Sequence, residues 1–118
     1  MDSHLKRTMN DRVHWTMKAL EENGMPAFYA ETTQEAVEVV KSFLKKGDEI
    51  SCGGSVTLKE SGINELMKNG EYDFLDRDAA GKSGGDIYHR ALSCDVYLTG
   101  TNAITEKGEL YNVDGNGN

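Results

Sequence analysis

Apolar side chains recur every three or four positions in residues 1–23, which predicts an amphipathic helix with one apolar stripe. The stripe consists of Leu5, Met9, Val13, Met17 and Leu20. Trp15 falls away from the centre of this stripe and is a candidate interface residue. Asn23 and Gly24 predict the end of the helix, because Gly readily adopts the left-handed conformation of a C-cap.

A short strand and a second helix are predicted next. Residues 26–30 read Pro-Ala-Phe-Tyr-Ala, with Pro at the start of a strand, where a missing N–H is tolerated. Thr32 and Glu35 have the spacing of a capping box, so we expect a helix from there to about Lys46, ended by Gly47. The side chains expected to face inward are those of Ala36, Val37, Val40, Phe43 and Leu44.

The rest of the chain alternates strand patterns with helix patterns. Strands are predicted at residues 48–52, 72–76, 95–99, 103–105 and 109–113, and helices at residues 56–60, 63–67 and 86–93. The last two strands form a hairpin around Gly108, and residues 77–85 form a Gly-rich loop. Such alternation predicts one α/β domain over residues 1–118, with a mostly parallel sheet flanked by helices.

Composition and charge exclude several classes of protein. The chain has 118 residues and a formal net charge of −7, which argues against binding along nucleic-acid phosphates. No apolar run reaches the roughly 18 residues of a membrane span, and the first residues lack the apolar core of a secretion signal. Cys52, Cys94 and three isolated His residues have no metal-ligand spacing, so we expect no metal, no cofactor and a reducing cytoplasm.

Two loops with small and polar residues follow predicted strands. Gly53, Gly54 and Ser55 come directly after residues 48–52, and residues 99–102 follow residues 95–99. Ligands of parallel α/β sheets bind at the carboxyl ends of the strands, so we expect both loops at one edge. Backbone N–H groups and hydroxyls at a helix start suit an anion, although the first loop is also compatible with a tight turn in which Ser55 is an ordinary N-cap.

Two motifs resemble the LUD-domain family, the lactate utilisation proteins. Residues 52–62 resemble the family segment GGS-x-T-x-x-E-x-G, and residues 95–118 resemble the longer signature ADV-(F/Y)-LTG-x-NAIT-x-x-G-x-L-x-N-x-DG-x-GN-R. The resemblance implies a three-layer fold similar to ribose-5-phosphate isomerase, glucosamine-6-phosphate deaminase and CoA-transferases. Family members continue beyond this motif, so the resemblance implies that the chain is the N-terminal part of a longer domain, truncated at its C-terminal end.

The resemblance also implies a set of site residues and partners. Some members of the family act with iron–sulfur partner proteins in the oxidation of L-lactate to pyruvate. A small carboxylate or phosphorylated ligand would be held by Gly53, Gly54, Ser55, Thr57, Thr99, Gly100, Asn102, Gly115, Asn116 and Asn118. Asp114 and Glu60 are the candidate acid/base carboxylates. Because a sheet that ends at Asn118 would expose an unpaired edge, we also expect a homo-oligomer.

Three functions remain open from the sequence. The first is a lactate-utilisation protein that binds the small anion at the loop pair. The second is a non-catalytic subunit of an electron-transfer complex, in which Gly100, Gly108, Asn102 and Asn112 shape turns and caps. The third is an enzyme like the sugar-phosphate isomerases, and whether the chain is an enzyme at all stays open. No nucleic acid and no membrane is expected as a partner.

Overall fold

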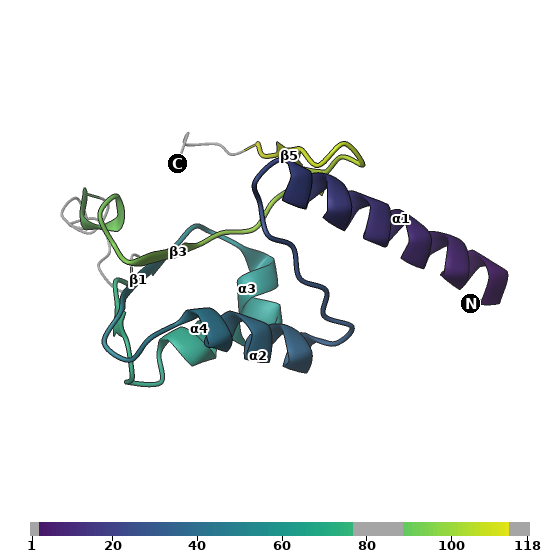
Figure 1. Cartoon of the computed structure of the whole chain (residues 1–118). Helices are drawn as coiled ribbons and strands as arrows, with labels where there is room; N and C mark the ends of the chain where they lie inside the picture. The colour runs from purple at the N-terminus through teal and green to yellow at the C-terminus, as the bar shows by residue number, and fades with distance from the viewer. Residues whose placement is uncertain (1–2, 77–88, 114–118) are drawn as a thin grey trace. The chain divides into compact units, whose positions relative to one another are not determined.

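The structure is a computed structural model that describes residues 3–76 and 89–113 (Figure 1). The chain divides into two compact units. We call Ala30–Gly100 the sheet unit, and residues 1–29 together with residues 101–118 the terminal unit. Each unit is described by itself.

The sheet unit contains a parallel three-stranded sheet. The central strand β1 (Glu49–Cys52) pairs with β2 (Asp73–Phe74) on one side and with β3 (Val96–Leu98) on the other. Helices α2 (Thr33–Phe43), α3 (Val56–Glu60) and α4 (Ile63–Met67) lie on one side of these strands (Figure 1). The predicted α/β fold with a mostly parallel sheet is therefore confirmed.

The core of the sheet unit lies between these helices and the sheet. Its buried cluster consists of Ile50 on β1, Leu58 on α3, and Ile63 and Met67 on α4. From α2, the side chains of Val37, Val40 and Leu44 pack against that cluster. The expectation that Phe43 is buried is wrong, since the residue is 55% exposed. The backbone of Leu44 is extended (φ −95°, ψ 142°), and this turns the side chain of Leu44 inward at the helix end.

The start of α2 is confirmed, whereas its predicted end is wrong. Thr32 is the N-cap, and its hydroxyl accepts a hydrogen bond from the Glu35 N–H at 3.1 Å. The Glu35 carboxylate accepts the N–H of Glu31 rather than that of the N-cap residue. The helix ends at Phe43, three residues before the predicted Lys46, because Lys45 and Asp48 form a turn in which each N–H is bonded to the other residue.

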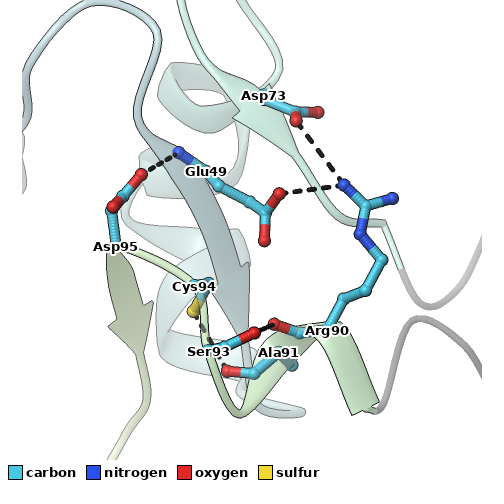
Figure 2. A network of polar contacts seen from close by, with 7 residues as sticks. All are labelled: Glu49, Asp73, Arg90, Ala91, Ser93, Cys94 and Asp95. Carbon is cyan, nitrogen blue, oxygen red and sulfur yellow. Dashed lines mark hydrogen bonds and ion pairs between the residues drawn. The ribbon is translucent and has the colours of Figure 1, made fainter.

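A polar network ties the segment before β3 to the amino ends of the strands (Figure 2). The Arg90 guanidinium donates to the Glu49 carboxylate at 2.8 Å and lies 3.8 Å from the Asp73 carboxylate. The carboxylate of Asp95 accepts the N–H of Glu49 at 2.9 Å. Because these exposed ion pairs contribute about 0–1 kcal/mol each, the network positions the strands more than it stabilises them.

The terminal unit consists of a long helix and a hairpin. Helix α1 spans Ser3–Glu22, and strands β4 (Ala103–Ile104) and β5 (Leu110–Tyr111) are antiparallel, as predicted. Gly108 closes the hairpin with φ +80° and packs directly on α1, since a Cβ placed there would lie 2.5 Å from the Ala19 carbonyl carbon. The Asn23 side-chain amide donates to the carbonyls of Lys107 and Gly108 at 3.0 Å.

The strand predicted before α2 and the loop and helix predicted before β3 remain to be compared with the structure. The strand predicted at residues 26–30 is wrong, because these residues are not strand in the part of the chain that the structure describes, and three of them, Ala27, Phe28 and Tyr29, line a groove beside α1 instead. The loop predicted at residues 77–85 and the first part of the helix predicted at residues 86–93 lie outside the described residues. Residues 89–91 are helical.

Candidate functional site

The two polar loops leave adjacent strands at the same edge of the sheet. Cys52 at the end of β1 is in register with Leu98 at the end of β3, and the Gly53 N–H donates to the Leu98 carbonyl at 2.9 Å. Because β1 and β3 are parallel, residues 53–55 and residues 99–100 continue side by side from the carboxyl edge. The proximity expected from the sequence is therefore observed for these five residues.

Hydroxyl groups from β3 and from both loops gather around two glycines. A Cβ placed on Gly53 would lie 3.1 Å from the Thr99 hydroxyl oxygen and 3.3 Å from the Tyr97 hydroxyl oxygen. A Cβ placed on Gly100 would lie 2.9 Å from the Ser55 hydroxyl oxygen. Both glycines thus permit a close approach of backbone to hydroxyl, which a larger residue would obstruct.

Gly54 differs from its two neighbours in the loop. A Cβ placed on Gly54 would have no atom of the described residues within 4 Å apart from its two chain neighbours, and Gly54 is exposed. No contact within the described residues therefore requires a glycine at this position. The backbone of Gly54 is open to a molecule that approaches the loop from outside.

Ser55 has a structural role in addition to its position beside Gly100. Its backbone is extended, and its hydroxyl oxygen accepts a hydrogen bond from the Leu58 N–H at 3.4 Å as the N-cap of α3. A hydroxyl has one donor and two acceptor positions, so capping leaves a donor and an acceptor for a ligand. The N–H groups of Val56 and Thr57 in the first turn have no acceptor within the helix. With only five residues, α3 provides a short dipole.

The remaining predicted site residues are distributed over different parts of the chain. Thr57 and Glu60 are exposed on α3, and helix geometry puts Glu60 about 7 Å beyond Ser55 along the axis. Asn102 belongs to the terminal unit, where its side-chain oxygen accepts the Val113 N–H at 2.8 Å. Asp114, Gly115, Asn116 and Asn118 lie outside the described residues.

Tyr97 is a member of the cluster that the sequence reasoning missed. The sequence pattern assigns Tyr97 only to the predicted strand at residues 95–99, whereas the residue is 44% exposed. Its neighbours in β3, Val96 and Leu98, pack against the core. Because side chains alternate along a strand, Tyr97 lies on the face opposite to that of Val96 and Leu98. The strand pattern could therefore have indicated that Tyr97 faces away from the core.

The described residues contain no group of three or more His, Cys, Asp or Glu side chains that could hold a metal ion. Among the described helices, none is both long and apolar enough to cross a membrane. The chemistry that the described residues offer at the carboxyl edge is that of hydroxyls and backbone amides.

Fold and site together define an α/β protein with a parallel sheet and a cluster of small and hydroxyl-bearing residues at the carboxyl edge of its strands. A sequence model of the LUD domain matches residues 13–118. The chain belongs to the LUD-domain family, as its two motifs indicate. No curated protein and no solved structure matches it.

Proposed function

We propose that this LUD-domain protein acts in lactate utilisation by binding a small anionic ligand at the loops that follow β1 and β3. One observation carries the proposal: the Thr99 and Tyr97 hydroxyls lie beside Gly53 and the Ser55 hydroxyl lies beside Gly100, where adjacent parallel strands reach their carboxyl edge. That edge is where α/β sheets bind their ligands. Family membership supports the same assignment.

Hydrogen-bond donors suit a carboxylate or phosphate at this place. A hydrogen bond to a charged group contributes about 1.5–3 kcal/mol, roughly twice the value for neutral pairs. The proposed donors are the hydroxyls of Ser55 and Thr57 and the loop amides around Gly54, since the Thr99 hydroxyl donates to the Gly100 carbonyl at 3.2 Å. Asn102 and Asn116 are proposed to orient the ligand.

Oxidation of L-lactate to pyruvate removes two electrons and two protons from the substrate. We propose that the electrons pass to an iron–sulfur partner protein, as the resemblance to the lactate utilisation proteins implies. Asp114 and Glu60 are the proposed carboxylates for proton transfer. Of these steps, the binding of the anion can be tested with the isolated chain.

Ser55→Ala tests the anion site, with Thr32→Ala as a matched control. Each variant loses an N-cap hydroxyl, so each should lose about 0.5–2 kcal/mol of unfolding free energy. Calorimetric titration with L-lactate, pyruvate and inorganic phosphate should show weaker binding only for Ser55→Ala, by about tenfold. Equal affinities in the two variants would contradict the proposal, as would the absence of binding by the unmodified chain.

One observation favours a second candidate, a non-catalytic subunit of an electron-transfer complex. Motif residues take structural roles: Asn102 caps the N–H of Val113, Ser55 caps α3, and Gly108 closes the hairpin against α1. This candidate predicts stable association with an iron–sulfur protein and no affinity for any of the three small anions. Pull-down experiments combined with the titrations above therefore separate the two functions.

A further inference from the structure

Helix α1 presents apolar side chains on its surface. None of its residues Ser3–Glu22, all of which are described, is buried. Leu5, Met9 and Val13 are 52%, 47% and 36% exposed, which is unusual for the apolar stripe of an amphipathic helix. Exposed apolar side chains of this kind are typical of a surface that another molecule buries.

The second half of the stripe forms the floor of a groove within the terminal unit. The groove has a volume of about 480 Å³ and is lined by Met9, Val13, Met17 and Leu20 of α1 together with Phe28 and Ile104. An ion pair of 2.6 Å between Arg12 and Glu106, both of which line it, holds the hairpin to the helix. The groove therefore has apolar walls and enough room for large side chains of a partner.

Charges are distributed unequally along α1. Lys6 and Arg7 lie in its first two turns, whereas Glu21 and Glu22 form its end. Two copies of α1 packed in parallel would place like charges together, which disfavours that arrangement. Two antiparallel copies would place the basic start of each helix against the acidic end of the other. The positive end of each helix dipole would then also lie beside the negative end of the other dipole, which is favourable.

We propose that a second copy of this chain covers the stripe, with the two α1 helices packed antiparallel about a two-fold axis near Val13 and His14. In this arrangement Lys6 and Arg7 of one copy meet Glu21 and Glu22 of the other, twice by symmetry. Such an isologous contact pairs the same patch on both subunits, and two-fold dimers are the commonest oligomers. Leu5 and Met9 of one copy then pack into the second half of the stripe on the other.

Sedimentation velocity on the whole chain tests the apolar part of this contact. The chain should sediment as a dimer at micromolar concentration, and Val13→Glu should weaken dimerisation by about tenfold or more, because it places two charges beside the axis. Leu92→Glu is the matched control, since Leu92 is 87% exposed and lies in the sheet unit. A monomeric unmodified chain, or equal effects of the two variants, would overturn the proposal.

Charge reversal tests the antiparallel direction. Lys6→Glu combined with Arg7→Glu should weaken the dimer, and adding Glu21→Lys and Glu22→Lys should restore it, with helix content by circular dichroism unchanged throughout. A chain damaged in folding would not be rescued by two further substitutions. Failure of the rescue would overturn the antiparallel contact. Binding of α1 to anionic phospholipid vesicles in place of dimerisation would assign the stripe to a membrane surface and overturn the proposal.

Discussion

Gly108 and Gly24 have almost the same backbone conformation in different surroundings. Their φ angles are +80° and +84°, a region that side chains other than that of glycine occupy only at a cost of about 1–2 kcal/mol. A Cβ on Gly108 would also lie 2.5–2.7 Å from backbone atoms of Ala19 and Leu20, whereas a Cβ on Gly24 would have no atom of a described, non-neighbouring residue within 4 Å. Only Gly108 therefore determines how closely the hairpin packs on α1.

We expect Gly108→Ala to destabilise the protein more than Gly24→Ala does. Gly24→Ala should cost about 1–2 kcal/mol for its backbone conformation alone. Gly108→Ala adds a clash with backbone that cannot rotate away, for a total of about 2–5 kcal/mol. Urea unfolding of the two variants measures the difference, and equal midpoints would show that the hairpin does not pack on α1 at this residue.

Single residues with a local mechanism were predictable from the sequence. The Thr32 cap, the Gly108 turn and the Ser55 cap all follow from interactions within a few residues along the chain. Phe43 was predicted wrongly because helical spacing alone does not tell which of two neighbouring residues faces the core where the helix ends. Tyr97 was missed because residues 95–99 were interpreted only as a strand, and only the loop that follows them was interpreted as part of the site.

Whole elements were likewise predictable where their signals are local, and were predicted wrongly where they depend on distant neighbours. Helix α1, helix α2 and the hairpin have strong periodic or turn signals, and they were predicted to within a few residues. The apolar run at residues 26–30 looks the same as a strand in sequence, but a strand exists only if a neighbouring strand offers it hydrogen bonds. In the structure Ala27, Phe28 and Tyr29 line a groove beside α1, which the sequence pattern does not indicate.

The packing of helix α4 against the sheet can be tested by truncating its most buried side chain. Met67 is fully buried in the core cluster, and truncation to Ala should cost about 2–5 kcal/mol because a cavity remains beneath the sheet. Leu92→Ala, at a residue that is 87% exposed, should stay within about 0.5 kcal/mol of the unmodified protein. If the two substitutions have similar effects on denaturant unfolding, α4 does not hold the core as described.

The two edges of the sheet differ in chemistry when the molecule is considered as a whole. Charged residues gather at the amino ends of the strands, where Arg90 meets Glu49 and Asp73, and they hold the segment before β3 in place. Hydroxyls and glycines gather at the carboxyl ends. Structural ion pairs and the proposed ligand site are therefore separated by the length of the strands.

The location of the site could be predicted only in part from the sequence. Parallel strands imply that loops 53–55 and 99–100 share an edge, but the sequence does not specify that β1 and β3 are neighbours. Asn102, which follows these loops in the chain, accepts the Val113 N–H within the terminal unit, and its role at the site stays a prediction. The roles of Asp114, Gly115, Asn116 and Asn118 stay predictions.

Gly54→Ala tests most directly whether a ligand occupies the carboxyl edge. A methyl group there meets no described protein atom, so the free energy of unfolding should stay within about 1 kcal/mol of the unmodified value. Affinity for L-lactate, pyruvate or inorganic phosphate should nevertheless fall by about tenfold in calorimetric titrations, because the methyl group occupies space that the bound anion needs. Unchanged affinity for an anion that the unmodified chain binds would show that the anion does not approach this loop, and would contradict the account.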